Sequence, residues 1–366
     1  MPGSQGDAPC LRPTLLAAVP KVMDVIRSNI LKKVDEGDSF KAWMFHKAFR
    51  AKQAALRVGQ DTPFWNRLVF DKLRTRILGG RVRLMVSGGG PLSAATQLFM
   101  NACFCCPVGQ GYGLTETVGA GTVTAPDDFT VGRVGAPVGC TQVKLIDWED
   151  GGYTTRDAEG PRGEVLIGGP NITMGYFKLP EKTAETFFTD ANGTRWMRTG
   201  DIGKWHKDGC LEIIDRRKDL VKLKHGEYVS YGKVESNLRR TDIIENICVF
   251  ADPLEANCVA LVLPERLELE AWAKATRNAN AGNWEALCAD PAANAEVKRR
   301  MDAMAAEAGL ARFEKPARIT LLPGEWTPEN DLVTAALKLK RHNIYRTPEG
   351  AAALAEMYDK APAGQG

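Results

Sequence analysis

The chain has 366 residues, of which 44% are hydrophobic and 25% are charged, as is ordinary for a globular protein of two or three domains. Its net charge of +3 is too small to indicate a nucleic-acid partner, and no apolar run reaches the roughly 18 residues of a transmembrane helix. The N-terminus, MPGSQGDAPC, lacks the apolar segment of a signal peptide, and nine scattered cysteines suit a reducing compartment, so we expect an intracellular protein without a targeting signal.

Helical periodicity marks residues 13–57. One helix is expected to begin at Pro20, because apolar residues recur near a spacing of 3.6 from Val22 to Val34. A second is predicted for residues 40–56. A third should begin at Pro63, which suits a first helical position, and end at the Gly79-Gly80 pair.

The segment VRLMVSGGGPLS (82–93) predicts a strand that leads through a glycine turn into a helix. Its three glycines would let a flat ligand approach the backbone, since no Cβ stands in the way. No Lys-Ser or Lys-Thr follows them, so this is not a Walker loop. Taken alone, the glycines Gly88–Gly90 are more typical of a turn than of a binding site.

The pattern then repeats: a helix at 94–104, a strand at 103–109 and GQGYGLTETVG. Such units predict a mostly parallel sheet with ligands at the strand ends. Tyr112 lies between two glycines, where its ring could cover a base. Thr115 and Glu116 could serve a phosphate and its Mg²⁺, a cation that prefers oxygen ligands. Helix capping explains any one of these residues but explains the whole segment poorly.

Three cysteines within this segment, Cys103, Cys105 and Cys106, include a CxxC spacing. A structural zinc site needs four ligands, and no second Cys or His pair follows at a suitable distance. We therefore expect small apolar side chains in a buried strand.

Residues 132–197 change to short alternating strands, among them VKLIDWED, GEVLIGG and RWMRTGD, which predict a small antiparallel β subdomain. Residues 199–230 continue with a turn at Asp201 and a β-hairpin, in which Asp208-Gly209 would supply the positive φ angles of a tight turn. A cationic corner follows, from Arg216 to a second turn at Gly226. An anionic ligand with hydroxyl groups would suit this corner, and a solvated charged surface is the alternative.

The remainder alternates helices and strands. We predict a helix at 231–240, strands at 246–251 and 257–263, an alanine-rich helical region at 265–310, and a strand at 318–322. Trp272 and Trp284 should anchor the helical region by packing. Residues 361–366 are expected to be a disordered tail.

Three separated motifs, GYGLTET (111–117), residues 199–230 and LVTAALKLKR (332–341), together resemble the adenylate-forming acyl-CoA synthetases. The last two are similar to the long-chain fatty acyl-CoA synthetase branch. VGRVGAPVGC, GPNITMGYFK and FMNACFCCPVGQGYGLTET are especially similar to its animal-type members. The likeness extends from about Pro13 to Tyr358.

This resemblance implies a ligase that activates a fatty acid with ATP and Mg²⁺ to an acyl-adenylate and then transfers the acyl group to coenzyme A. It implies that Gly89, Gly90 and Tyr112, with Gly113, border the adenine, and that Asp201 takes both ribose hydroxyls. The physics agrees, because a carboxylate can accept from two neighbouring hydroxyls at once.

For the phosphate and the reaction, the resemblance implies that Thr115 contacts the α-phosphate and that Glu116 holds Mg²⁺. Lys338 would bridge the carboxylate and the α-phosphate during adenylation, where negative charge develops. Arg216 would assist at the nucleotide. Lys218 would be the pivot about which a C-terminal domain turns between the half-reactions, with Lys222 on the same arm.

The expected fold class is α/β plus α+β. Residues 1–130 would form a partial parallel-sheet α/β domain, 131–215 an antiparallel β subdomain that completes it, and 216–360 a smaller, mobile α+β lid.

The chain departs from the resemblance in one respect. The family carries a Ser/Thr/Gly-rich phosphate loop ending in Pro-Lys before the adenine-binding glycines, and residues 1–82 contain no such loop. We therefore expect a C-terminal portion of such an enzyme, with weak activity alone. Full-length members associate with endoplasmic reticulum or other organelle membranes, but this chain shows no anchor.

Two alternatives stay open. One is a non-catalytic short form that binds nucleotide, acyl-CoA or a partner chain. The other is a ligase for aromatic acids, although GPNITMGYFK and GEYVS argue against it.

Overall fold

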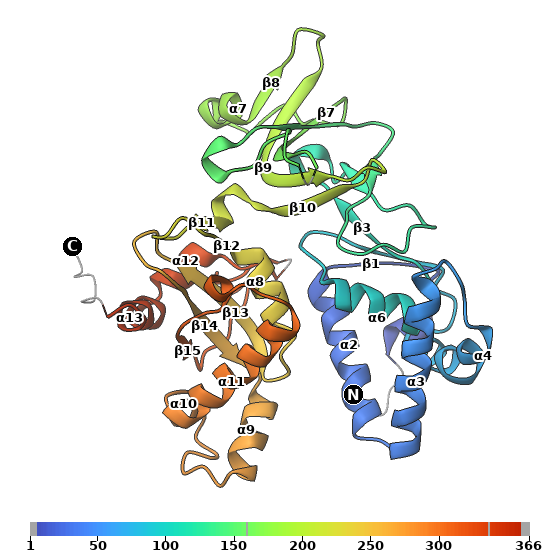
Figure 1. The fold of residues 1–366 in the computed structure, drawn as a ribbon, viewed down its shortest axis with the longest axis vertical. Coiled ribbons are helices and arrows are strands. Elements are labelled where there is room, and N and C mark those ends of the chain that lie inside the picture. The colour runs from blue at the N-terminus through green and yellow to red at the C-terminus, as the bar shows by residue number, and fades with distance from the viewer. Residues whose placement is uncertain (1–5, 159, 336, 360–366) are drawn as a thin grey trace. The chain divides into compact units, whose positions relative to one another are not determined.

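The computed structural model describes residues 6–158, 160–335 and 337–359, and the predicted tail at 361–366 lies outside them. The chain divides into two compact units, Met1–Ile214 and Asp215–Gly366 (Figure 1). The predicted combination of α/β and α+β architecture, with parallel and antiparallel sheets and covering helices, is confirmed. Among the described residues, no helix is both long and apolar enough to cross a membrane.

Unit 1 begins with a short helix that was not predicted, α1 (Asp7–Leu11). The following helices largely agree with the predicted ranges: α2 (Pro20–Asp35), α3 (Ser39–Leu56), α4 (Pro63–Trp65), the π-helical turn η1 (Asn66–Phe70) and α5 (Asp71–Leu78). Gly79 ends α5 with a φ of 72°, as expected of a helix-ending glycine. The helical reading of 13–57 was wrong for Leu15–Ala18, which forms strand β1 and pairs in parallel with β2.

A five-stranded sheet in the order β1-β2-β3-β4-β5 organises this unit. Strands β1 to β3 are parallel, and β4 and β5 are antiparallel additions. Helices α2, α3 and α6 pack against one another beside it (Figure 1). The new elements are β2 (Leu84–Ser87), α6 (Ala94–Phe104), β3 (Val108–Tyr112), β4 (Thr122–Val123) and β5 (Ala136–Pro137).

The strand predicted at 103–109 starts later, because Cys103 and Phe104 complete the last turn of α6. Cys105 ends that helix in the left-handed region, with a φ of 49°. Cys103 and Cys106 are buried as expected, but they lie at a helix end and in its exit loop, not in a strand. Burial raises the pKa of the Cys106 thiol to about 12, as befits an inert packing residue.

A second, antiparallel sheet in unit 1 has the order β10-β9-β7-β6, with β8 also paired to β9. Its elements are β6 (Gln142–Ile146), β7 (Arg162–Gly168), α7 (Pro180–Thr186), β8 (Phe187–Thr189), β9 (Arg195–Trp205) and β10 (Leu211–Arg216). These agree with the predicted alternating strands. Val165, Ile167, Met197 and Leu211 form its buried core.

The turn between β9 and β10 is longer than the predicted two-residue turn. The His206 N–H donates to the Cys210 carbonyl at 2.9 Å, and the Gly209 N–H donates to the His206 carbonyl at 3.0 Å. The positive φ lies at Gly209, at 81°. This is the pattern of a three-residue loop with glycine in the left-handed position.

Unit 2 contains a two-stranded ribbon, β11 (Leu220–Lys222) with β12 (Tyr228–Ser230), and a sheet in the order β13-β14-β15. The sheet strands are β13 (Ile244–Ala251), β14 (Cys258–Pro264) and β15 (Ile319–Leu321). Its helices are α8 (Tyr231–Leu238), α9 (Arg266–Ala275), α10 (Trp284–Cys288), α11 (Pro291–Glu307), α12 (Arg341–Arg346) and α13 (Pro348–Met357).

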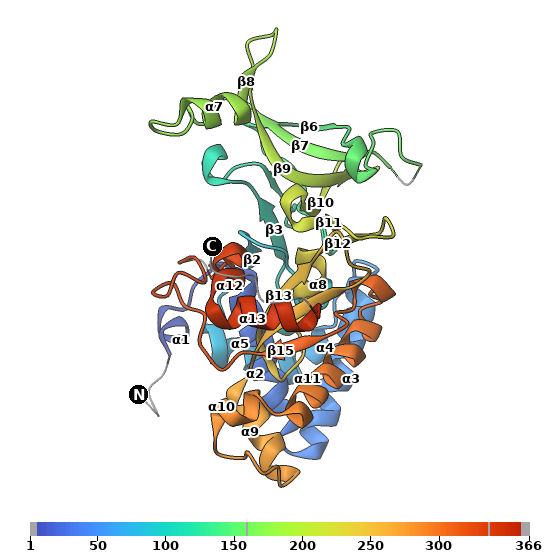
Figure 2. The ribbon, with the colours of Figure 1, turned by 90° about the vertical axis from the view of Figure 1, so that its left-hand side faces the viewer.

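Alternate residues of β14 pack into two separate hydrophobic cores. Ala260 and Val262 face a core shared with α8, α9 and α11, and Val259 and Leu261 face one shared with α12 and α13 (Figure 2). Such two-sided burial is expected of a strand covered on both faces. Trp272 and Trp284 pack against the first core, as predicted.

Candidate functional site

Two glycine-containing loops leave the same edge of the parallel sheet. β2 ends at Ser87, whose neighbour across the ladder is Gln110 of β3, so the loop beginning at Gly88 lies beside the end of β3. A Cβ on Gly88 would lie 3.3 Å from the Gly111 carbonyl oxygen. Gly89 takes a φ of 82°, and Gly89 and Gly90 are exposed. The predicted adenine-bordering glycines therefore sit at an open strand end.

Gly113 has a packing role that its sequence position did not reveal. A Cβ there would lie 2.4 Å from the carbonyl oxygen of Gly119. Only a glycine fits such an approach, and it lets the chain fold back immediately after Tyr112.

Asp201 lies in strand β9, not in a turn as expected from the sequence. The register with β7 shifts by two residues, so Thr199 to Asp201 stand opposite Val165 alone, and Gly200 has a φ of 70°. Thr199 secures this bulge, because its Oγ1 donates to the Val165 carbonyl at 2.7 Å and accepts from the Asp201 N–H at 3.0 Å. Bulges of this kind redirect a side chain.

The bulge brings Asp201 to Tyr112. The Tyr112 hydroxyl donates to Asp201 Oδ2 at 2.6 Å, although 89 residues separate them in sequence. Asp201 is only 3% exposed. The structure thus joins two residues for which the resemblance implies contacts with the same nucleotide.

Thr115 and Glu116 belong to a 3₁₀ turn, η2 (Thr115–Thr117). Thr117 Oγ1 accepts from the Leu114 N–H at 3.0 Å, and Val118 follows in the left-handed region with a φ of 55°. Thr115 is exposed and Glu116 is half-buried. The turn therefore presents a hydroxyl and a carboxylate side by side.

A neighbouring segment, 171–176, holds this turn. The Thr173 N–H donates to the Glu116 carbonyl at 2.9 Å, and Asn171 Nδ2 donates to the carbonyls of Thr117 and Ala120, both at 3.0 Å. The Tyr176 hydroxyl donates to Glu116 Oε1 at 2.8 Å. Our sequence reading missed Tyr176, although the GPNITMGYFK segment that contains it was one of the resemblance motifs.

Burial, followed by the hydrogen bond to Glu116, raises the pKa of Tyr176, so the phenol stays protonated at neutral pH and acts as a donor. Its ring centroid lies 5.5 Å from that of Phe187. Both rings line a cavity of about 500 Å³ together with Met174, Phe177 and Arg195.

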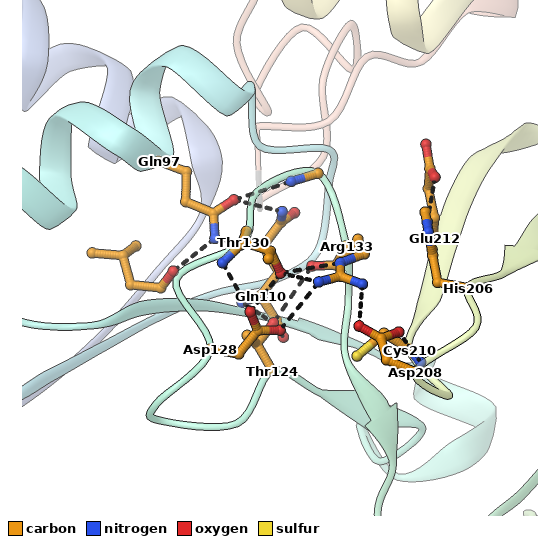
Figure 3. A network of polar contacts seen from close by, with 12 residues as sticks. Gln97, Gln110, Thr124, Asp128, Thr130, Arg133, His206, Asp208, Cys210 and Glu212 are labelled. Carbon is orange, nitrogen blue, oxygen red and sulfur yellow. Dashed lines mark hydrogen bonds and ion pairs between the residues drawn. The ribbon is translucent and has the colours of Figure 1, made fainter. Parts of the chain in front are cut away.

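A polar network joins α6 and β3 to the loop between β4 and β5, where the Gly132 N–H donates to Gln97 Oε1 at 3.4 Å (Figure 3). Gln110 Nε2 donates to Gln97 Oε1 at 3.0 Å, and Gln97 Nε2 donates to the Val108 carbonyl at 2.8 Å. Arg133 Nη1 donates to Asp208 Oδ2 at 2.5 Å, which ties the loop to the β9–β10 turn. That hydrogen bond holds the pKa of Asp208 below its usual range.

The remaining predicted residues belong to unit 2. Arg216 ends β10, Lys218 lies in the 3₁₀ turn η4 (Arg217–Asp219) and Lys222 ends β11, and all three are exposed. Lys222 Nζ lies 5.7 Å from the centroid of the Tyr228 ring. One continuous segment therefore carries all three cations.

Asp215 precedes these cations and is buried. Its Oδ1 accepts the Arg216 N–H at 2.7 Å, and a Cβ on Gly232 would lie 3.2 Å from the same oxygen. Burial raises the pKa of Asp215 to about 6.

Lys338 is exposed on a short backbone hairpin. Val333 and Leu339 form an antiparallel bridge, the Lys340 N–H donates to the Leu332 carbonyl at 2.9 Å, and the Thr334 N–H donates to the Lys338 carbonyl at 2.8 Å. Ala336, within the motif, lies outside the described residues. The hairpin presents Lys338 close to its tip.

Comparison with known proteins shows what this chain is similar to. A family model described as "AMP-binding enzyme" matches residues 6–177. Long chain acyl-CoA synthetase 8 of Arabidopsis thaliana is 47% identical over 348 residues, which are 93% of this chain and 48% of that protein. Long-chain-fatty-acid–CoA ligase 1 of Homo sapiens is 36% identical over 340 residues, 92% of this chain and 47% of that protein. The chain spans about half the length of the curated relatives it matches.

Solved structures of other proteins have a similar fold. The A domain of a carboxylic acid reductase from Segniliparus rugosus, in complex with AMP and a co-purified carboxylic acid, aligns with a TM-score of 0.73 and 26% identity over 96% of this chain and 48% of that one. The anthranilate CoA ligase AuaEII, in complex with anthranoyl-AMP, aligns with a TM-score of 0.58 and 19% identity over 97% of this chain and 54% of that one, which supports the fold alone.

Proposed function

Since this chain is a homologue of the long-chain acyl-CoA synthetases and carries an AMP-binding enzyme segment, we propose that it binds an acyl-adenylate as part of a long-chain fatty acid–CoA ligase. In that reaction the fatty acid carboxylate attacks the α-phosphorus of ATP and displaces pyrophosphate. The thiol of coenzyme A then attacks the acyl carbon and displaces AMP.

The observation that carries the proposal is the pairing of Tyr112 with Asp201 at the glycine-lined end of the parallel sheet. Asp201 accepts the ribose hydroxyls in exchange for the Tyr112 hydroxyl, and the Tyr112 ring and Gly89, Gly90 and Gly113 border the base. A charge-assisted hydrogen bond contributes about 1.5–3 kcal/mol, so a diol held by one carboxylate is a strong contact.

Glu116 and Thr115 serve the phosphate. Mg²⁺ keeps most of its waters and takes one or two carboxylates together with substrate phosphates, so a single presented carboxylate suits it. The metal supplies charge neutralisation at the α-phosphate. Thr115 donates its hydroxyl to the same phosphate.

Unit 2 would supply the cations. Lys338, near the tip of its hairpin, stabilises the charge that develops during adenylation, and Arg216 assists at the nucleotide. Lys218 is the pivot and Lys222 part of the arm of a lid that changes position between the half-reactions. The corresponding domains would be 1–130, 131–215 and 216–360.

A second candidate is a form that binds nucleotide or acyl-CoA with little turnover. One experiment separates the two. Isothermal titration with a non-hydrolysable acyl-adenylate, such as palmitoyl-sulfamoyl-adenosine, tests binding. AMP release from palmitate, ATP and coenzyme A tests turnover.

We expect binding that an Asp201→Asn substitution weakens about tenfold or more. Binding that is absent, or that the substitution leaves unchanged, would contradict the proposal. Turnover in the same sample would assign the complete ligase reaction to this chain, and its absence would assign the binding form. Sedimentation with liposomes tests whether the chain associates with membranes.

A further inference from the structure

Unit 2 buries a charged pair that the proposed reaction does not use. Arg341 Nη2 lies 2.8 Å from Glu235 Oε2, and Glu235 Oε1 accepts the Val249 N–H at 2.9 Å. The side chains of Arg341 and Glu235 are 18% and 5% exposed. The Arg341 guanidinium also lies 5.2 Å from the centroid of the Tyr231 ring.

Such a pair is a poor source of net stability, because both ions lose their water. An apolar pair of the same volume is often as stable or more so, whereas removal of one partner costs about 3–5 kcal/mol. Burial raises the pKa of Glu235 to about 7, which shows how strongly the interior disfavours its charge. Stability alone therefore does not account for the arrangement.

The same guanidinium faces a second carboxylate from a different segment. Asp219 Oδ2 lies 3.9 Å from Arg341 Nη2. Asp219 is the last residue of η4, the turn that contains Lys218. One side chain thus contacts carboxylates from η4 and from α8.

The backbone of Arg341 continues directly into the Lys338 hairpin. Lys340 is bonded to Leu332 through the backbone, and its ammonium pairs with Asp331. Asn343 Nδ2 donates to the Asp331 carbonyl at 2.8 Å and to its Oδ2 at 2.7 Å. A displacement of Arg341 would therefore be transmitted to the hairpin as a whole.

We propose that Arg341 is a positioning residue that holds the Lys338 hairpin in a fixed relation to the η4 turn. Glu235 anchors the guanidinium in the interior of unit 2, and Asp219 connects it to the turn that carries Lys218. The two lysines then keep one geometry within unit 2. A role of this geometry in catalysis rests on the proposed function. The coupling of the η4 turn to the Lys338 hairpin through Arg341 does not.

Hydrogen–deuterium exchange on the full chain tests the link directly. The variant Asp219→Asn removes the charge on η4 and leaves the buried Arg341–Glu235 pair in place. We expect exchange to accelerate several-fold in peptides covering 217–222 and 332–340 and to stay unchanged in β13 and β14. Asp219→Glu should restore protection. Glu307→Gln, which disrupts the Arg240–Glu307 pair at 2.8 Å, is the matched control and should alter neither segment.

Unchanged exchange at 332–340 in Asp219→Asn would overturn the proposal. Uniform acceleration across unit 2 would overturn it as well, because it would show a general loss of stability. Arg341→Lys, which keeps the charge but removes the guanidinium whose Nη2 contacts both carboxylates, should also accelerate exchange at 332–340.

A kinetic readout distinguishes this proposal from the proposed function. In acyl-adenylate formation, Asp219→Asn should lower kcat about tenfold with little change in KM for ATP, since Lys338 acts on the transition state. Absence of nucleotide binding by the unsubstituted chain would refute the proposed function and leave the exchange result to decide the link. Binding and turnover together with unperturbed exchange would refute the link alone.

Discussion

The Tyr176 hydroxyl donates a hydrogen bond to the Glu116 carboxylate at 2.8 Å, and so joins two segments that lie 60 residues apart. Glu116 itself sits in a 3₁₀ turn whose backbone the 171–176 segment also holds. The orientation of the carboxylate is therefore set from outside its own turn, by a donor that carries no charge.

Replacement of Tyr176 by Phe tests this orientation. The ring packing against Phe187 is preserved and one hydrogen bond to a carboxylate is lost, so we expect the free energy of unfolding to fall by about 1–2 kcal/mol. Mg²⁺-dependent nucleotide binding should weaken several-fold. Urea unfolding and titration of Mg²⁺ at fixed ATP measure the two effects. Phe187→Leu, which disturbs the packing and keeps the hydroxyl, should change stability but not the Mg²⁺ requirement.

Removal of the Tyr112 hydroxyl should not weaken nucleotide binding, in contrast to removal of the Tyr176 hydroxyl. In Tyr112→Phe, Asp201 loses its 2.6 Å hydrogen bond. Without the competing phenol, the carboxylate is more available to ribose, so we expect adenosine nucleotides to bind equally well or up to several-fold tighter. The free energy of unfolding should fall, because a buried carboxylate loses one donor. Weaker nucleotide binding by more than tenfold would show that the hydroxyl itself contacts the ligand.

Gly113→Ala tests the close approach after Tyr112. The new methyl would have to displace the Gly119 carbonyl, 2.4 Å from the ideal Cβ, so we expect a loss of roughly 2 kcal/mol or more in stability together with weaker nucleotide binding. Gly139 is the matched control, because a Cβ there meets nothing within 4 Å. Thermal unfolding of Gly139→Ala should stay close to that of the unsubstituted chain.

Asp215 should make stability depend on pH. Its folded pKa of about 6 lies above the ordinary value of 3.8, so the folded state binds the proton more tightly than the unfolded state. The resulting stabilisation is complete below about pH 4 and is lost as the pH rises through 6. Asp215→Asn removes this loss, so the variant should gain up to about 3 kcal/mol over the unsubstituted chain at pH 8 and little at pH 4.

The control for this prediction is Asp208, whose pKa is lowered by its hydrogen bond from Arg133. Asp208→Asn should destabilise the chain at pH 8, with the difference shrinking as the pH falls toward 3. Urea unfolding at pH 4, 6 and 8 measures both variants. Identical pH profiles for Asp215→Asn and the unsubstituted chain would show that the carboxyl is not buried as described.

Local sequence signals predicted most of the helices, although not α1. Pro20, Pro63 and Gly79 gave clear boundaries because each acts through its own backbone. Strand β1 was missed because four residues, Leu15–Ala18, are too few to display a period, and their strand character comes from pairing with β2. Cys103 was wrongly assigned to a strand because a short apolar run is compatible with both a strand and a helix, and periodicity alone does not distinguish them.

The long-range part of the site needed the structure. The two-residue register shift that directs Asp201 toward Tyr112 occurs opposite Val165, which lies on another strand. The local sequence Thr199–Asp201 therefore does not predict it. Tyr176 was overlooked for a similar reason, since its function lies in a partner 60 residues away. Asn171 Nδ2 donates to two backbone carbonyls, and a hydrogen bond to a carbonyl does not depend on the side chain of the accepting residue.

Strand β14 has a consequence for how unit 2 comes apart. All seven of its residues are buried, and alternate ones belong to two cores on opposite sides of the same sheet. A slip of one residue would exchange the two sets of side chains, so neither core can be reorganised while the other is kept. Thermal unfolding of unit 2 should therefore be a single cooperative transition, in which loss of packing by α12 and α13 also destabilises the packing of α8 and α11.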